Sequence, residues 1–277
     1  MSTGGVRVGF VGLGSQGAPM ARRIIEAGFP VTLWARRAET LAPFADTAAA
    51  TAGSPAELGA AVDLACVCVL ADADVEQVVA GPSGLLAGMR PGGVIAVHST
   101  VHPDTCAALA DQAAGHGVTL IDAPVSGGAP AAEAGRLLVM AGGDAAAVER
   151  ARPVFAAYGD PVVHVGPVGA GQRAKLINNL LLAANIGVAE SAFKLAGGLG
   201  LDLGQLAVVL AHGSGASTGA GLVGRAGFNL GAMSAQVGPL LQKDVRILAG
   251  LAESAGVKPG TVLDAAGAAL DSLGFPR

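Results

Sequence analysis

Short apolar runs alternate with alanine-rich helical stretches through the first part of this chain, and the alternation then stops. The runs are near-continuously apolar, as expected of strands buried on both faces of a sheet. They lie at Val6–Val11, Val31–Trp34, Leu64–Leu70, Val94–Val97, Val118–Ile121, Leu137–Met140 and Val162–Val165. Helices are predicted between them at Ala18–Ala27, Pro55–Ala61, Val75–Ala80 and Pro103–Ala114. Repeated alternation of strand and helix predicts an α/β fold with a doubly wound, mainly parallel sheet. The last strands follow one another closely, so we expect some of them to be antiparallel.

The strand pattern ends before Gly169, and apolar residues then recur at helical spacing from Ala170 to Leu199. Gly197-Gly198 is the stop signal of this long helix. Further helices are predicted at Asp202–Ala211, Leu222–Ala226, Pro239–Ala255 and Val262–Leu270, with a flexible loop over His212–Gly221. We therefore predict an α/β domain over residues 1–165 and an all-helical C-terminal domain over residues 166–277.

Composition excludes several classes of protein. The chain is 52% hydrophobic and 14% charged, which is the opposite of a disordered sequence. Its net charge of −4 lacks the basic face of a nucleic-acid-binding protein. The chain contains no run of about 18 uninterrupted apolar residues, so the sequence predicts no membrane span. Three cysteines and five scattered histidines lack the spacing of a metal site, so no metal is expected. The first residues lack a secretory pattern, so the expected location is the cytoplasm.

A glycine-rich turn directly follows the first predicted strand and opens a helix, which is the context that a G-x-G-x-x-G motif requires. Gly12 permits the tight turn, Gly14 lets the backbone approach a pyrophosphate, and Gly17 lets helix and strand pack closely. The anion would lie on N–H groups at the positive end of the helix. The sequence therefore predicts a Rossmann-type dinucleotide site formed by Gly12, Leu13, Gly14, Ser15, Gln16 and Gly17.

The end of the second predicted strand indicates which dinucleotide is bound. NAD-specific sites place Asp or Glu there to bind the ribose 2′-hydroxyl. This chain has Arg36 and Arg37 instead, and no acid before Glu39. Because guanidinium groups pair with phosphate in a bidentate fork, NADP is favoured, with NAD as the alternative. Two solvated surface arginines would give the same pattern.

Two further groups of residues suggest chemistry on a small substrate. Lys175 and Asn179 lie four residues apart in the long predicted helix, and therefore on one face. A lysine ammonium can donate a proton to a carbonyl oxygen that becomes a hydroxyl, or accept one in reverse. Ser126, Gly127 and Gly128 follow a predicted strand and offer a hydroxyl and N–H groups to a small anion. A surface lysine and a turn without ligand are the structural alternatives.

Four motifs in one order resemble those of the β-hydroxyacid dehydrogenases, which include 3-hydroxyisobutyrate dehydrogenase and tartronate semialdehyde reductase. The segment from Gly9 to Ala21 is similar to their N-terminal signature, and Asp122 to Gly128 to their substrate-binding segment. Gly166 to Asn179 resembles their G-x-x-G-x-G-x-x-x-K-x-x-N-N helix. Lys243-Asp244 matches a Lys-Asp pair in their C-terminal domain, which is of the 6-phosphogluconate dehydrogenase type.

The resemblance implies a role for each of these residues. Lys175 would be the catalytic acid/base and Asn179 would orient the substrate, a small hydroxyacid or its semialdehyde or ketone. Ser126, Gly127 and Gly128 would bind its carboxylate. The cofactor would further contact Val69, Leu70, Thr100 and Lys243, whereas Asp244 would be structural.

Two other functions share part of this pattern. Imine reductases have the same fold and glycine-rich loop, but usually carry another residue at the position of the lysine. Non-catalytic dinucleotide-binding relatives lose the lysine, so Lys175 argues against both alternatives. Gln16 departs from the family, which usually has Met in the phosphate loop, and the substrate itself stays open. The long apolar helix predicts a homodimer or homotetramer formed through the helical domain.

Overall fold

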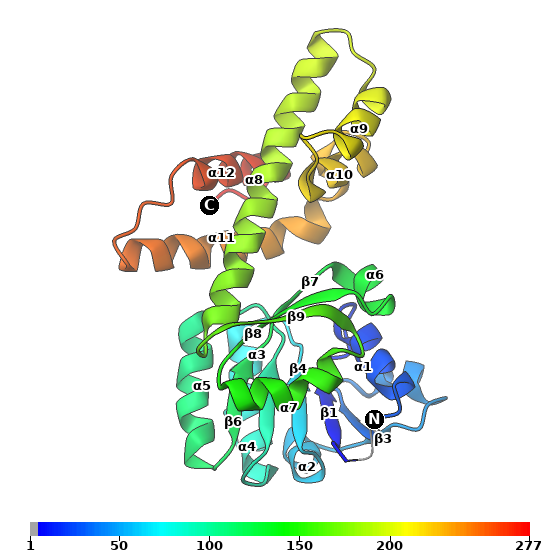
Figure 1. Cartoon of the computed structure of the whole chain (residues 1–277), viewed down its shortest axis with the longest axis vertical. Helices are drawn as coiled ribbons and strands as arrows, with labels where there is room; N and C mark the ends of the chain where they lie inside the picture. Colours follow the sequence, from blue (N-terminus) through cyan, green and yellow to red (C-terminus); the bar gives the residue numbers. More distant parts are fainter. Residues whose placement is uncertain (1–4) are drawn as a thin grey trace. The chain divides into compact units, whose positions relative to one another are not determined.

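The computed structural model describes residues 5–277, apart from the side chain of Ala232. The described chain forms two compact units that meet in sequence between Lys175 and Leu176. The first unit is an α/β sandwich around a nine-stranded sheet (Figure 1). Its strands are β1 (Val8–Val11), β2 (Val31–Trp34), β3 (Ala50–Thr51), β4 (Leu64–Val67), β5 (Val94–Val97), β6 (Thr119–Asp122), β7 (Val125–Ser126), β8 (Leu137–Gly142) and β9 (Gly159–Gly166).

The sheet is doubly wound, which confirms the predicted fold class. Its strand order is β3-β2-β1-β4-β5-β6-β8-β7, and β9 pairs with β8. The strands from β3 to β6 are parallel, whereas β8 is antiparallel to β6 and β7. The chain moves from β1 through β2 to β3 on one side and returns to build β4, β5 and β6 on the other. Open sheets of this kind bind ligands outside the carboxyl ends of the strands at such a reversal, here between β1 and β4.

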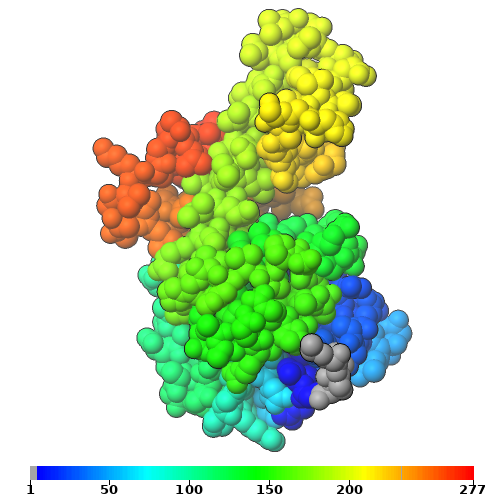
Figure 2. All heavy atoms as spheres, in the orientation of Figure 1, coloured from blue at the N-terminus to red at the C-terminus, as the bar shows by residue number. Residues whose placement is uncertain are grey.

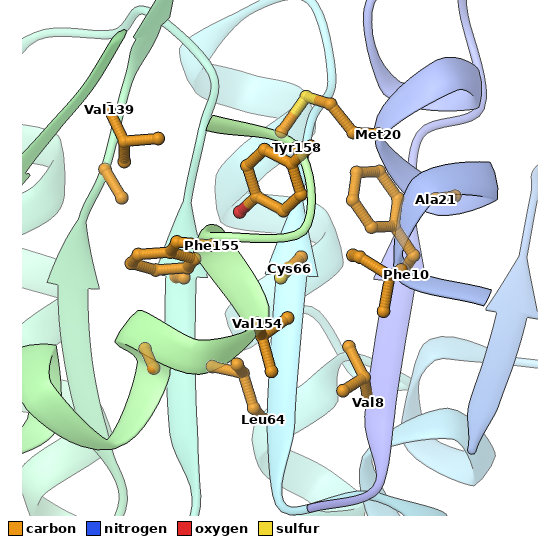
Figure 3. Packing of buried hydrophobic residues seen from close by; sticks show 14 of the residues in the cluster. Val8, Phe10, Met20, Ala21, Leu64, Cys66, Val139, Val154, Phe155 and Tyr158 are labelled. Carbon is orange, nitrogen blue, oxygen red and sulfur yellow. The ribbon is translucent and has the colours of Figure 1, made fainter. Parts of the chain in front are cut away.

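Helices cover both faces of the sheet, and the sheet separates two hydrophobic cores. They are α1 (Gly17–Glu26), the 3-10 helix η1 (Ala38–Phe44), α2 (Pro55–Ala61), α3 (Asp72–Ala80), α4 (Leu85–Gly88), α5 (Pro103–Gly115), α6 (Gly128–Glu133) and α7 (Ala145–Phe155). Successive strand residues point to opposite faces. Phe10 and Cys66 therefore pack in the core under α1 and α7, whereas Val11 and Val67 pack in the core under α2 to α5. Figure 3 shows Phe10, Phe155 and Tyr158 gathered around Cys66.

The elements that the sequence did not predict are short or lack apolar periodicity. β3 has two exposed residues, and β7 has two residues beside a glycine pair. Helices α4 and α6 are four and six residues long, so neither completes a periodic pattern. Helix α7 is the exception, because it was missed although it has eleven residues with apolar ones at helical spacing. Asp144 caps it by accepting a hydrogen bond from the Ala147 N–H at 2.8 Å. The predicted strand over residues 64–70 ends at Val67, because the chain turns there into the groove described below.

The second unit is helical and begins at Leu176, within the long helix α8 (Ala170–Gly198). It contains α9 (Leu203–His212), α10 (Thr218–Arg225), the 3-10 helix η2 (Leu230–Ala232), α11 (Ser234–Ser254) and α12 (Thr261–Leu273). Leu180, Ala184 and Phe193 of α8 pack in a third core with residues of the later helices. Figure 2 shows the spheres of α9 and α10 directly against the C-terminal part of α8. By length and hydropathy alone α8 could span a bilayer, but half of its most apolar window is buried inside the protein.

Two helix starts in this unit differ from the sequence prediction. The predicted loop over His212–Gly221 is wrong in its second half, because α10 begins at Thr218. Ser217 caps this helix by accepting a hydrogen bond from the Ala220 N–H at 3.0 Å. Helix α11 begins at Ser234 rather than at Pro239, which lies inside its second turn. Proline is compatible with the first turn of a helix, and this made Pro239 resemble a start signal.

The predicted boundary after Val165 was based on the change from strands to helices. The two compact units instead divide ten residues later, between Lys175 and Leu176. The strands end at Gly166, but the first residues of α8 bond to the first unit. Gln172 is fully buried there. The start of α8, including Lys175, therefore belongs structurally to the α/β unit.

Candidate active site

A groove of about 300 Å³ lies at the carboxyl ends of β1, β2 and β4. Residues that follow each of these strands form its wall: Gly12, Leu13 and Gly14 after β1; Ala35, Arg36, Arg37 and Thr40 after β2; Cys68, Val69 and Leu70 after β4. Helix α3 contributes Asp74, Gln77 and Val78, and Trp34 adds an aromatic side chain. The groove thus lies at the reversal in strand order where a doubly wound sheet binds ligands.

The glycines of the β1–α1 turn have the geometry that a bound pyrophosphate needs. Gly12 has φ +93°, and a Cβ there would overlap the Cys68 carbonyl group. A Cβ at Gly17 would overlap the Gly12 carbonyl oxygen, so Gly17 permits the close contact between turn and helix. At Gly14 a Cβ would meet no protein atom within 4 Å, which leaves this stretch of backbone open to a ligand. Gln16 precedes α1 without capping it, and no acid lies in the first turn. These residues fit a dinucleotide.

The two arginines after β2 line the groove with side chains that are 78% and 76% exposed. Arg36 forms an ion pair with Asp74, Nη1 to Oδ1, at 3.3 Å. Arg37 approaches Glu39 at 3.8 Å. Asp74 was not predicted, because it comes from α3 and reaches the groove only through the fold. The sequence around the end of β2 holds no sign of it.

The loops after β4 and β5 are bonded to each other beside the groove. Ser99 accepts a hydrogen bond on its Oγ from the Val69 N–H at 2.8 Å. Thr100 follows Ser99 at the carboxyl end of β5, the strand next to β4. Val69 and Leu70 line the groove, and Leu70 is largely exposed. The structure thus places the predicted cofactor-binding residues of the first unit around one edge of the sheet.

The turn from β7 into α6 consists of Ser126, Gly127 and Gly128. Gly127 and Gly128 have φ of +131° and +72°, a conformation that favours glycine. Ser126 pairs with Leu138 of the antiparallel strand β8. The segment therefore lies beyond the carboxyl end of β6, the strand beside β5. A small anion at this turn would find backbone N–H groups and a hydroxyl.

Lys175 is held in the first unit through the start of α8. The buried carboxylate of Asp122, at the end of β6, accepts hydrogen bonds from the N–H groups of Gly169 at 2.6 Å and Gln172 at 2.7 Å. Burial raises the pKa of Asp122, while these N–H donors favour its charged form. The Gln172 side chain bonds in turn to Ser99 and Val101. Gln172 could not be predicted as part of the site, because a lone glutamine in a helix carries no sequence signal.

The second unit contains the remaining predicted residues, which are linked through Asp244 by hydrogen bonds and an ion pair. Asn178 donates to Asn179 Oδ1 at 3.1 Å, and Asn179 donates to Asp244 Oδ2 at 2.6 Å. Lys243 forms an ion pair with the other oxygen of Asp244 at 3.2 Å. Asp244 is 3% exposed, and its two oxygens contact the Asn179 amide and the Lys243 ammonium.

Beneath the loops, His98 bonds to two further segments of the first unit. Its Nδ1 lies 2.6 Å from the Ala123 carbonyl oxygen, which can only accept, so Nδ1 carries the proton. Nε2 then accepts from the Tyr158 hydroxyl at 3.1 Å. Burial lowers the pKa of His98 to about 4, so this side chain is neutral and structural. The Cys66 thiol bonds to Tyr158, and burial raises the pKa of Cys66.

Two family models match consecutive parts of the chain. Residues 7–166 match the NAD-binding domain of 6-phosphogluconate dehydrogenase. Residues 169–270 match the NAD-binding domain of NADP-dependent 3-hydroxyisobutyrate dehydrogenase. Together these matches include the groove, the turn after β7, and the residues of α8 and α11.

Known proteins resemble the chain over most of its length. The L-threonate dehydrogenase of Cupriavidus necator is 37% identical over 211 residues, 76% of this chain and 71% of the relative. The NAD-dependent L-serine dehydrogenase of Pseudomonas aeruginosa is 38% identical over 210 residues, 76% of this chain and 70% of the relative. The structure of Mycobacterium tuberculosis 3-hydroxyisobutyrate dehydrogenase with L-serine has a TM-score of 0.80 at 28% identity, covering 94% of this chain and 91% of that chain.

Imine reductases also share the fold, at greater distance in sequence. The structure of an imine reductase from Pseudomonas sp. has a TM-score of 0.66 at 16% identity, covering 94% of this chain and 90% of that chain. At this identity the likeness concerns the fold alone. The family models and the hydroxyacid dehydrogenase relatives agree with the motifs of the chain. The chain therefore belongs to the β-hydroxyacid dehydrogenase family.

Proposed function

We propose that this chain is a reductase or dehydrogenase that prefers NADP and interconverts a small β-hydroxyacid with its semialdehyde or ketone. The observation that carries the proposal is the position of Lys175. It follows the anchored start of α8 and belongs to the same compact unit as the dinucleotide groove. The family and the geometry of the glycine turn support a nicotinamide cofactor.

The cofactor and each of the proposed site residues have one role in the proposed reaction. When bound, a reduced nicotinamide supplies a hydride to the carbonyl carbon of the substrate, and an oxidised one accepts it in reverse. The Lys175 ammonium donates its proton to the carbonyl oxygen as the hydroxyl forms, and the neutral amine takes it back in oxidation. Asn179, one turn along α8, orients the substrate, and its amide is fixed by Asp244. Ser126, Gly127 and Gly128 bind the carboxylate.

The preference for NADP rests on Arg36 and Arg37. Both line the groove with accessible guanidinium groups, and no carboxylate follows β2 directly. Asp74 competes for Arg36, but an exposed ion pair contributes little. The names of the relatives include both cofactors, since one is NAD-dependent and one family description is NADP-dependent. We assign Lys243 to the cofactor as well, on the strength of the resemblance.

The relatives narrow the substrate class. L-threonate and L-serine, which two of them are named for, both carry a hydroxyl on the β-carbon of a carboxylic acid. A carboxylate is also the group that the turn after β7 would bind. We therefore infer that the substrate is a small β-hydroxyacid.

A panel of β-hydroxyacids, semialdehydes and cyclic imines, measured with both cofactors, tests this function. The expected result is turnover of L-serine, L-threonate or 3-hydroxyisobutyrate, with a higher kcat/KM for NADP⁺ than for NAD⁺. Turnover of cyclic imines alone would show the proposed reaction to be wrong. Tight binding of NADPH, measured by its fluorescence, without turnover of any compound would instead indicate a non-catalytic binding module.

We also propose that the protein is a homodimer or homotetramer formed through the second unit. Several apolar side chains along α8 are more than half exposed there, among them Leu181, Val188 and Leu195. Their spacing of seven residues aligns them along one side of the helix. Exposed apolar stripes of this kind mark association surfaces.

A further inference from the structure

One buried side chain, that of Gln172, connects the helix that carries Lys175 to the loop after β5. Gln172 Nε2 donates a hydrogen bond to the Ser99 carbonyl oxygen at 2.8 Å, and its Oε1 accepts one from the Val101 N–H at 3.1 Å. The same amide therefore holds the chain immediately before and immediately after Thr100. Gln172 and Val101 are fully buried, and Ser99 is 3% exposed, so water does not compete for these bonds.

Gln172 is itself held at its backbone. Its N–H donates to Asp122 Oδ2, and the Gly169 N–H donates to Asp122 Oδ1. A Cβ at Gly142 or Gly171 would lie within 3 Å of the Asp122 carboxylate, so these glycines admit the carboxylate to the helix start. One connected set of hydrogen bonds thus links the ends of β5 and β6 to the first turn of α8.

The position of Lys175 depends on this first turn. Lys175 lies three residues after Gln172 in the same helix and is the last residue of the first unit. An extended lysine places its Nζ about 8 Å from the helix axis, so a rotation of about 10° moves it by about 1.4 Å. A displacement of about 1 Å at a reacting group can cost about 100-fold in rate.

We propose that Gln172 is a positioning residue, which fixes Thr100 and the first turn of α8 in one geometry and thereby sets the distance from Lys175 to the loop carrying Thr100. The inference rests on the proposed roles of Lys175 as acid/base and of Thr100 beside the cofactor. Gln172 acts through its two backbone partners and does not touch the substrate. Its loss removes a constraint on the geometry, while the glycine turn and Arg36 still bind the cofactor.

The first test replaces Gln172 by alanine and separates catalysis from binding. Gln172→Ala is expected to lower kcat about 10- to 100-fold, with the substrate KM and the Kd for NADPH within about threefold of wild type. The Val101 amide should lose protection from hydrogen exchange, a readout that needs no substrate. Unchanged kcat together with a protected Val101 amide would overturn the proposal.

A second variant, Gln172→Glu, keeps the shape of the side chain and tests the bonds themselves. A carboxylate can still accept from Val101 but can donate to Ser99 only when protonated. Burial beside the Asp122 carboxylate and the Cys106 thiol, which bonds to the Gln172 side chain, raises the pKa of such a group. The ratio of variant to wild-type kcat is therefore expected to rise about fivefold or more between about pH 9 and about pH 6. A ratio that stays constant would show that the bond to Ser99 does not set the rate.

The matched control is Thr47→Val. The Thr47 hydroxyl also joins two backbone groups, donating to the Phe44 carbonyl oxygen at 2.7 Å and accepting from the Ala49 N–H at 3.3 Å. This variant should change stability without changing kcat or its pH dependence. Lys175→Ala separates the two proposals. If it abolishes turnover while both Gln172 variants behave as wild type, only the positioning role is wrong, whereas unchanged turnover in Lys175→Ala contradicts the proposed function.

Discussion

Arg36 has two competing partners in the groove. Its guanidinium is largely exposed toward the groove and forms the ion pair with Asp74 at 3.3 Å. Exposed pairs contribute about 0–1 kcal/mol, whereas a charge-assisted bond to phosphate contributes about 1.5–3 kcal/mol. A 2′-phosphate can therefore take the place of Asp74 as the partner of Arg36 with a net gain.

Replacement of Arg36 by Asp tests this assignment. The variant should weaken binding of NADPH about 10- to 100-fold, because it removes a phosphate partner and adds a repelling charge. Binding of NADH should change less than about threefold. Fluorescence titration measures both, and Arg90→Asp, the same charge reversal at an exposed site outside the groove, is the control. Equal losses for the two cofactors would contradict the role of Arg36.

His98 makes stability depend on pH. Its pKa is lowered to about 4 by burial, from an ordinary value of 6.5. Between these values the unfolded chain binds more protons than the folded chain, so the free energy of unfolding rises with pH through this window. Acidification below pH 6.5 therefore removes stability, up to about 3 kcal/mol once pH reaches about 4.

The comparison of wild type with His98→Gln isolates this effect from that of the carboxyl groups. Wild type should lose stability more steeply on acidification than the variant, as measured by urea unfolding from neutral pH to about pH 4. His116→Gln, at an exposed histidine after α5, should follow the wild-type curve. Parallel curves for wild type and His98→Gln would show that His98 is not held neutral.

Single residues differ in how well the sequence indicates them. Gly12, Gly14 and Gly17 could be predicted, because their spacing after a strand has one common use. Asp74 and Gln172 could not, because each reaches its partners only when elements distant in sequence come together. Lys175 could be singled out by its resemblance to a motif, but the contacts that hold its helix are tertiary.

The β1–turn–α1 element can be tested by comparing two of its glycines. Gly17 packs against the Gly12 carbonyl, whereas the Cα of Gly14 faces open space on the protein. The same substitution should therefore act on folding at one position and on ligand binding at the other.

Gly14→Ala is expected to keep the Tm of the free protein within about 2 °C of wild type, since an added Cβ meets no protein atom within 4 Å. Its affinity for NADPH should fall about 10-fold or more, because the Cβ fills the space that the pyrophosphate approaches. Gly17→Ala should lower the Tm through its overlap with Gly12. Thermal unfolding with and without NADPH measures both effects. Unchanged affinity in Gly14→Ala would show that the pyrophosphate does not bind at this glycine turn.

The strands and helices that could be predicted are those with a clear apolar pattern in the sequence. The buried strands β2 and β5 and the capped helix α2 occur with the predicted bounds. The short connections predicted that some of the last strands are antiparallel, and β8 is antiparallel to β6 and β7. Short elements such as β7 and α6 were not, because their conformation is set by neighbouring strands and positive-φ glycines.

The exposed large apolar side chains of the described residues lie mostly in the second unit. Val188 is 59% exposed at the middle of the stripe on α8. The cytoplasmic location stays a prediction, as does the oligomer.

Light scattering at micromolar concentration is expected to give the mass of a dimer or a tetramer. Val188→Glu should shift the distribution toward the monomer, because it buries an unpaired charge in the contact. Val257→Glu is the control, since Val257 is equally exposed after α11 but lies outside the stripe. A wild-type monomer would contradict the proposed assembly.

The most direct test of the account is the turnover of Lys175→Ala on a β-hydroxyacid that the wild type oxidises. We expect kcat to fall about 10²- to 10⁴-fold, as for the loss of a positioned acid/base, with little change in the Kd for NADPH. Lys194→Ala, at an exposed lysine paired with Glu190 on the same helix, should retain wild-type turnover. Near wild-type turnover in Lys175→Ala would show that the acid/base lies elsewhere.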